Sequence, residues 1–239
     1  MTAKLLQIPQ IEARIVFPSN PDRRKLAVIA HPWARLGGSW DDRVVRHVLQ
    51  IFLSVSVPTV IFNSRGAGES TKSPSWTGRG EADDYAEVLK AGMDEVWSGT
   101  NQGSRTGEVF ICGYSHGALL ALAQPPCSDP LRTFYVIISP PLSYKWFLTP
   151  TLRLLPVPLS PPLSSHSQLL DRPTVLVFHG TSDMFASIRA VRDWVRSAGN
   201  ESVVRLIETV DGDHFWRSPD GLLMMDRDIR AWLAQSLDH

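Results

Sequence analysis

One short motif constrains the fold of this chain more than any other feature: glycine-x-serine-x-glycine, set between an apolar strand and an apolar helix. Residues 109–120 read VFICGYSHGALL, so Ser115 lies between Gly113 and Gly117. A sharp turn that lifts a serine above a sheet crowds its neighbours, and only residues without a Cβ fit there. The serine also precedes a helix, whose first backbone amides favour developing negative charge. The motif therefore predicts a nucleophilic serine at the end of a buried strand.

A serine hydroxyl is a poor nucleophile near neutral pH, so it needs a general base and an acid that orients the base. In folds that carry a serine on such a strand–turn–helix motif, the three catalytic residues follow one another along the chain in the order Ser, Asp, His. Asp183 follows the apolar run 174–178 within the sequence HGTSD, and His214 lies in the glycine-containing sequence VDGDHFW. We therefore expect Ser115, Asp183 and His214 to be the catalytic residues.

Each of these residues has a simpler interpretation when taken alone. Asp183 has the spacing of an N-cap for a helical segment that begins near Phe185. His214 alone would be a solvated loop histidine. Asp211 and Asp213 are rival acids, although their closeness in sequence to His214 makes them harder to aim at its ring.

Acyl transfer also requires donors for the oxyanion, and backbone amides at strand ends usually supply them. The amide of His116, directly after the serine, is the first candidate. The second is expected in the loop 31–38, which reads HPWARLGG. Pro32 has no amide hydrogen, so Trp33 is the nearest candidate donor.

Short apolar, β-branched runs alternate with segments of helical periodicity, which is typical of a mostly parallel sheet covered by helices. The chain of 239 residues fits a single α/β domain, residues 1–239. The predicted strands are Ala13–Phe17, Leu26–Ala30, Thr59–Phe62, Val109–Cys112, Thr133–Ser139, Thr174–Phe178 and Val203–Glu208. The predicted helices are Asp42–Ser54, Glu81–Val96, His116–Ala123, Ser187–Ala198 and Pro219–Leu237.

The segment 140–173 interrupts this alternation, because it combines many prolines with large apolar side chains. Proline removes a backbone donor and clashes with the preceding helical turn, so a regular helix is not expected to persist there. The segment is interpreted as a lid or cap insertion, the alternative being a loop packed on the surface.

These motifs together resemble the α/β-hydrolase superfamily, in its branch with a serine nucleophile. The HPxxxxGG sequence from His31 to Gly38 is similar to that of small serine hydrolases, and the loop from Arg65 to Ser70 resembles the superfamily's RGxGxS loop. The resemblance implies an esterase or thioesterase that works through an acyl-enzyme, with a small-molecule or carrier-bound acyl substrate. The narrower family has a short connection where this chain carries residues 140–173, so an apolar lid would shelter a hydrophobic acyl group.

A lid of that kind favours two finer hypotheses. Transfer of the acyl group to the substrate's own hydroxyl would give a lactone, as thioesterase-like members of polyketide pathways do. The main alternative is a non-catalytic ligand-binding protein of the same fold.

Several further side chains near the predicted site carry two interpretations each. His31 and His179 end strands and are either buried structural residues or part of a pocket. Arg65 either pins its glycine turn by hydrogen bonds or binds a substrate carboxylate. The aromatic residues Trp146, Phe147 and Trp216, together with Trp33, lie in predicted loops and are interpreted as substrate-pocket walls, with a core or surface role as the alternative.

Composition limits the partners. Lys and Arg together number 24, as do Asp and Glu, so no excess charge favours nucleic acid or an anionic membrane. The chain has neither an apolar run of about 18 residues nor an N-terminal signal pattern, and we expect a cytoplasmic protein without a membrane span. Cys112 and Cys127 have no metal-site spacing, and no metal or cofactor is expected. The oligomeric state does not follow from the sequence.

Overall fold

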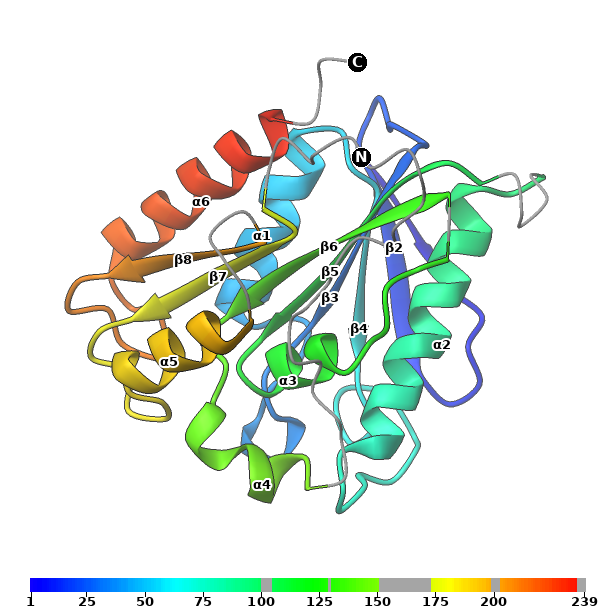
Figure 1. The fold of residues 1–239 in the computed structure, drawn as a ribbon. Helices are drawn as coiled ribbons and strands as arrows, with labels where there is room; N and C mark the ends of the chain where they lie inside the picture. Colours follow the sequence, from blue (N-terminus) through cyan, green and yellow to red (C-terminus); the bar gives the residue numbers. More distant parts are fainter. Residues whose placement is uncertain (100–104, 129, 151–172, 199–202, 236–239) are drawn as a thin grey trace.

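The computed structural model describes residues 1–99, 105–128, 130–150, 173–198 and 203–235, and within them the chain forms an eight-stranded sheet (Figure 1). The strand order across the sheet is β1-β2-β4-β3-β5-β6-β7-β8. The strands are β1 (Thr2–Leu5), β2 (Glu12–Phe17), β3 (Lys25–Ala30), β4 (Thr59–Asn63), β5 (Gly107–Tyr114), β6 (Leu131–Ile138), β7 (Val175–Gly180) and β8 (Val204–Thr209).

Strands β3 to β8 pair in parallel, whereas β1 and β2 pair antiparallel at one edge. The central strands are buried along almost their whole length, which explains their continuous apolar runs. The chain passes from β3 to β4 on one side and returns to β5 on the other, so the order reverses beside β3. In open α/β sheets, ligands bind at the carboxyl ends of the strands at such a reversal.

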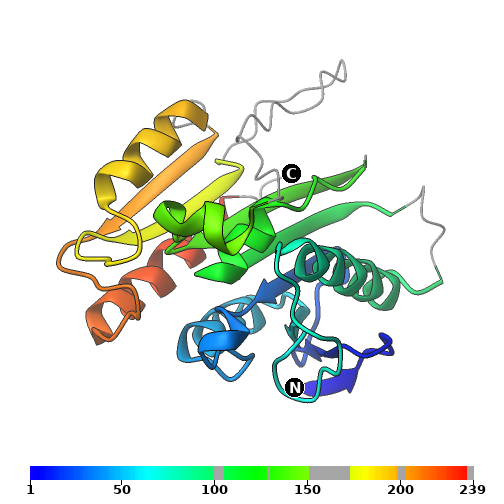
Figure 2. The same cartoon turned by 90° about the horizontal axis from the view of Figure 1, so that it is seen from below.

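Helices cover both faces of the sheet (Figures 1 and 2). One face carries α1 (Arg43–Ser54) and α6 (Pro219–Ala234), whose apolar residues form one core with the strands. The other face carries α2 (Arg79–Val96), α3 (His116–Leu122) and α5 (Ile188–Ala198), which belong to a second core. The sheet is thus the middle of three layers, and loops project from its carboxyl end.

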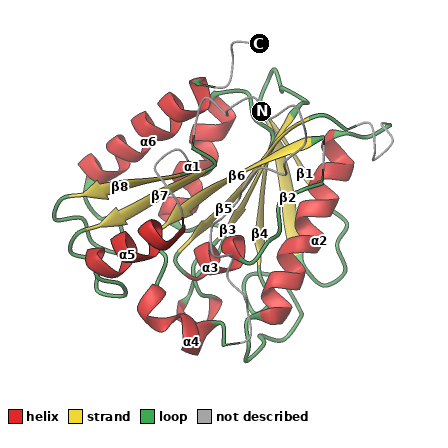
Figure 3. Cartoon of the chain, in the orientation of Figure 1, coloured by secondary structure: helices red, strands yellow, loops and turns green. Residues whose placement is uncertain are grey.

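The fold class predicted from the sequence is confirmed, and each of the seven predicted strands is present with ends shifted by a few residues. The structure adds β1, all of whose residues are exposed, and the short helix α4 (Lys145–Leu148) after β6, shown in red in Figure 3. Helix α4 lies in the proline-rich segment, but residues 151–172 of the predicted lid lie outside the described residues. None of the described helices is both long and apolar enough to cross a membrane.

Candidate active site

Ser115 occupies a sharp turn between β5 and α3. Its backbone has φ 55° and ψ −120°, and its amide donates to the carbonyl of Ile138 at the end of β6, at 2.9 Å. A Cβ on Gly113 would lie 2.0 Å from the Gly117 carbonyl oxygen, and a Cβ on Gly117 would lie 2.4 Å from that of Ala30. Both glycines are therefore required by close backbone contacts, as the motif predicts.

The structure brings the side chains of Ser115, Asp183 and His214 together. His214 Nδ1 lies 2.7 Å from Asp183 Oδ2, and His214 Nε2 lies 2.9 Å from Ser115 Oγ. An ionised carboxylate only accepts hydrogen bonds, so Nδ1 of the neutral ring carries the proton and donates to Asp183. Nε2 is then an acceptor, and the Ser115 hydroxyl donates to it.

Asp183 combines the two roles considered from the sequence. Its Oδ1 accepts from the amides of Phe185 and Ala186, at 2.7 and 3.2 Å, while Oδ2 binds His214. Burial alone would raise the pKa of Asp183, but the hydrogen bond from His214 and those from the backbone outweigh it and leave the pKa lowered. The carboxylate therefore stays charged, as an acid that orients a histidine must.

The rival acids are directed elsewhere. Asp213 Oδ2 accepts from the guanidinium of Arg217 at 3.1 Å, and its Oδ1 accepts from the Arg217 amide. Asp211 is exposed and has a positive φ of 55°. Of the three aspartates weighed from the sequence, Asp183 is the one in contact with His214.

His179 is fully buried beside Asp183. Its Nε2 donates to the carbonyl of Ala186 at 2.8 Å, while Nδ1 lies 3.8 Å from Asp183 Oδ2 and has no hydrogen-bond partner among the described residues. Burial lowers the pKa of His179. The ring is neutral and holds the loop that carries Asp183, which favours the structural interpretation over pocket lining.

His31 joins the loops that follow β3 and β4. Its Nδ1 donates to the Pro32 carbonyl at 2.5 Å, and its Nε2 accepts from the Ser64 amide at 2.9 Å. Burial lowers the pKa of His31 to about 4, and its bonding pattern suits only the neutral ring. His31 is thus also a structural residue.

Trp33 and His116, the candidate sources of oxyanion donors, lie on adjoining segments. Their rings are 6.3 Å apart, and the start of α3 contacts the end of β3 through Gly117. Burial lowers the pKa of His116 to about 4, so its ring adds no charge at neutral pH. The loop that carries Trp33 therefore begins beside the start of α3, the helix that follows Ser115.

The three residues predicted to bind substrate differ in their placement. Trp146 and Phe147 on α4 are 74% and 72% exposed, and the Phe147 ring meets Trp33 edge-on at 6.3 Å. Trp216 is only 2% exposed; it packs against Phe178 in the core. Trp216 therefore departs from the expected pocket wall, because its indole N–H finds a partner inside the protein and the ring fills the core.

Two residues in contact with His214 were not identified from the sequence. The hydroxyl of Tyr114 donates to the His214 carbonyl at 2.9 Å. The ring of Phe185 lies 4.4 Å from the imidazole, centroid to centroid. Both are adjacent or close in sequence to a predicted site residue, Ser115 or Asp183, and that proximity is the signal that would have pointed to them.

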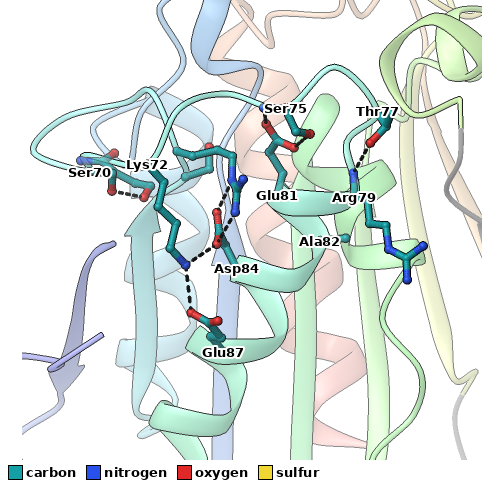
Figure 4. A network of polar contacts seen from close by, with 12 residues as sticks. Ser70, Lys72, Ser75, Thr77, Arg79, Glu81, Ala82, Asp84 and Glu87 are labelled. Atoms are coloured by element: carbon teal, nitrogen blue, oxygen red, sulfur yellow. Dashed lines mark hydrogen bonds and ion pairs between the residues drawn. The ribbon is translucent and has the colours of Figure 1, made fainter. Parts of the chain in front are cut away.

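The Arg65 guanidinium is hydrogen-bonded to a residue of α2 and is not free to bind a substrate carboxylate. Its Nε and Nη2 donate to the two carboxylate oxygens of Asp84, at 2.7 and 2.8 Å, and Lys72 donates to the same fully buried carboxylate and to Glu87. Figure 4 shows this network, with Lys72 reaching both acids from the loop after β4. The engaged guanidinium favours the interpretation that Arg65 pins its glycine turn.

Possible metal ligands and cysteine thiols were also predicted to play no part in the site, and the described residues bear on both. In the part of the chain that the structure describes, no cluster of three or more His, Cys, Asp or Glu side chains is arranged to hold a metal ion. Cys112 is buried in the core and Cys127 is half-buried, and both are free thiols.

A strand–serine–helix turn at the reversal of a mostly parallel sheet, with aspartate and histidine on later loops, defines the class of α/β hydrolases. The chain belongs to the alpha/beta hydrolase family, whose sequence model matches residues 27–239. No curated protein sequence matches the chain.

Solved structures agree with this assignment. A serine hydrolase homologue from Coxiella burnetii is similar with a TM-score of 0.70 and 21% identity, over 95% of both chains. A Xanthomonas campestris serine hydrolase described as lacking a lid has a TM-score of 0.71 and 22% identity, over 100% of this chain and 95% of the other. A Pyrococcus furiosus esterase has a TM-score of 0.69 and 16% identity, over 99% of this chain and 91% of the esterase chain. At these identities the likeness is one of fold.

Proposed function

We propose that this protein is a serine hydrolase that cleaves esters or thioesters through an acyl-Ser115 intermediate. The observation that carries the proposal is the continuous chain of contacts from Asp183 Oδ2 through His214 to Ser115 Oγ, at 2.7 and 2.9 Å. This is the arrangement that a general base needs to take a proton from a hydroxyl and to be oriented while it does so.

The steps follow from the roles of the three side chains. His214 Nε2 takes the proton of Ser115 as Oγ attacks the acyl carbon, and Asp183 stabilises the imidazolium that forms. His214 then returns the proton to the leaving alcohol or thiol as the bond from the acyl carbon to its oxygen or sulfur breaks. A water molecule then attacks the acyl carbon while His214 Nε2 takes its proton. His214 returns this proton to Ser115 Oγ as the bond from the acyl carbon to Oγ breaks, which releases the carboxylic acid and regenerates the Ser115 hydroxyl.

Charge that develops on the acyl oxygen requires donors close to Ser115. We assign this role to the backbone amides of His116, at the start of α3, and Trp33, in the loop after β3. Preset donors of this kind contribute about 3 kcal/mol each to the stabilisation of the transition state. Contact of a bound phosphonate oxygen with other amides would contradict this assignment.

The acyl group is proposed to be hydrophobic. Aromatic rings of Trp33, Phe147 and Phe185 lie around the turn and the base, and Phe147 is largely exposed beside Trp33. Such rings bind an acyl chain by apolar contact. A panel of p-nitrophenyl esters should show kcat/KM rising with acyl length, and Phe147→Ala should reduce that rise while leaving acetate hydrolysis unchanged.

Two acceptors could take the acyl group from Ser115. Water gives the free acid, whereas a hydroxyl on the acyl chain itself gives a lactone. We propose that a hydroxyacyl thioester distinguishes the two, with product analysis by mass spectrometry. Release of the linear acid alone would remove the lactone hypothesis and leave the hydrolase.

The experiment that tests the proposal is intact-protein mass spectrometry after treatment with a fluorophosphonate, on the wild type and on Ser115→Ala. A single adduct in the wild type alone is expected. An ester-turnover assay should show Ser115→Ala at least 10⁴-fold slower than the wild type, with an unchanged circular dichroism spectrum. Absence of both adduct and turnover in the wild type would favour a ligand-binding protein of this fold.

A further inference from the structure

Tyr114 links the nucleophile and the base in a second way. It precedes Ser115 directly in the chain, and its hydroxyl donates to the backbone carbonyl of His214 at 2.9 Å. The Tyr114 side chain is buried, and its ring lies 5.8 Å from the His214 ring. One residue is therefore covalently joined to Ser115 and hydrogen-bonded to the residue whose ring contacts Ser115.

The base needs such support because its loop has little regular structure of its own. His214 lies in the turn between β8 and α6, and Asp183 holds one side of its ring while the ring must present Nε2 to Ser115. A displacement of the carbonyl would move the whole residue, and even a small misplacement of reacting groups slows catalysis strongly. Burial raises the pKa of Tyr114 well above its ordinary value, so its hydroxyl remains a donor throughout the working pH range.

We propose that Tyr114 is a positioning residue that sets the distance between Ser115 and His214, by holding the His214 carbonyl to the turn that carries the nucleophile. This inference rests on the proposed function, because it concerns the same two groups. The hydroxyl touches neither reacting atom, so its effect is expected on the rate of acylation rather than on substrate affinity.

The chain provides a matched control in Tyr135. This tyrosine is buried on the neighbouring strand β6, and its hydroxyl donates to the Gln124 carbonyl at the same distance of 2.9 Å. Burial likewise raises the pKa of Tyr135. Tyr135 belongs to the core on the opposite face of the sheet from Tyr114. Tyr135→Phe and Tyr114→Phe thus remove equivalent hydrogen bonds, and only the second of these involves the base.

The test compares kcat, KM and the second-order rate of fluorophosphonate labelling for the wild type, Tyr114→Phe and Tyr135→Phe. Tyr114→Phe should lower kcat and the labelling rate by about 10-fold, with KM within about twofold of the wild type. Tyr135→Phe should keep wild-type kinetics although its melting temperature falls by a similar amount. Circular dichroism of each variant checks that it is folded.

Three outcomes would overturn the inference. Wild-type rates in Tyr114→Phe, or a rise in KM with kcat unchanged, would show that the hydroxyl does not position the base. An equal loss of rate in Tyr135→Phe would assign the effect to stability. Failure of the proposed function is distinguishable, because the wild type would then show no labelling at Ser115 at all.

Discussion

The indole N–H of Trp216 donates to the hydroxyl of Ser139 at 3.0 Å, across 77 positions of the sequence. Ser139 is the residue directly after β6 and has a positive φ of 44°, and Trp216 lies two residues after His214, also with a positive φ. Both side chains are buried. The loop that carries the base is thereby fastened to the end of the strand whose Ile138 carbonyl accepts from the Ser115 amide.

Ser139→Ala should destabilise the protein by about 1 to 3 kcal/mol, because it leaves the buried indole N–H of Trp216 without an acceptor. Urea unfolding at neutral pH measures this free energy. The double variant Ser139→Ala/Trp216→Phe should lose less free energy of unfolding than the two single variants lose together, because it contains no unsatisfied indole donor. Strict additivity of the two single effects would contradict this account.

Gly117→Ala should be among the most disruptive single substitutions in the chain. Its added Cβ would lie 2.4 Å from the Ala30 carbonyl oxygen and 2.6 Å from that of His31, and neither backbone can move without displacing β3. Thermal unfolding should show a large loss of stability or no folded protein. Gly99→Ala is the control, because it meets no atom within 4 Å and carries only the strain of its φ of 82°, about 1 to 2 kcal/mol. Equal melting temperatures for the two variants would contradict the steric argument.

Asp183→Asn should lower kcat by about 10³- to 10⁴-fold, because an amide no longer selects the His214 tautomer with the proton on Nδ1. Asp213→Asn should leave kcat within about threefold of the wild type, since the Asp213 carboxylate binds Arg217 instead. Steady-state kinetics with one aryl ester settles the comparison. A reversal, with Asp213→Asn the slower enzyme, would move the acid to Asp213.

Stability should fall in mild acid because of buried neutral histidines. The pKa of His31 is lowered to about 4 in the folded protein, below its ordinary value of 6.5. As the pH falls below 6.5, His31 becomes protonated in the unfolded chain but stays neutral in the folded protein. The contribution of His31 to the free energy of unfolding is therefore fully present above this pH and is lost as the pH falls toward 4. For His31 the loss between pH 7 and pH 5 is about 2 kcal/mol.

His31→Gln keeps an acceptor for the Ser64 amide and removes the titration. The difference in unfolding free energy between pH 7 and pH 5, measured in urea, should therefore shrink by about 2 kcal/mol in this variant. The same pH dependence in both proteins would show that His31 does not contribute to it.

Much of this architecture follows from local patterns. The parallel strands are buried on both faces, so their apolar runs are continuous and easily recognised. The edge strand β1 escaped prediction because its four exposed residues carry no such run, and α4 because the surrounding prolines argue against a helix. The antiparallel pairing of β2 depends on long-range contacts that no local pattern encodes.

The candidate site divides in the same way. The positions of Ser115, Asp183 and His214 could be predicted because each follows a recognisable strand, and carboxyl ends of parallel strands meet at one edge. The core placement of Trp216 could not be predicted, because it depends on Ser139, a residue distant in sequence. The catalytic roles of Ser115, Asp183 and His214 stay a prediction, which the fluorophosphonate-labelling experiment tests.

The parallel pairing of β6 with β7 has a practical consequence. Ser115 precedes this pair of strands in the chain, whereas Asp183 and His214 follow it. A polypeptide cut between the two strands would leave the nucleophile on one fragment and the base on the other. Each fragment would be inactive by itself, and hydrolysis would be restored only when the two fragments associate. The boundary between β6 and β7 is therefore a suitable position at which to divide the protein into a split-enzyme reporter of protein association.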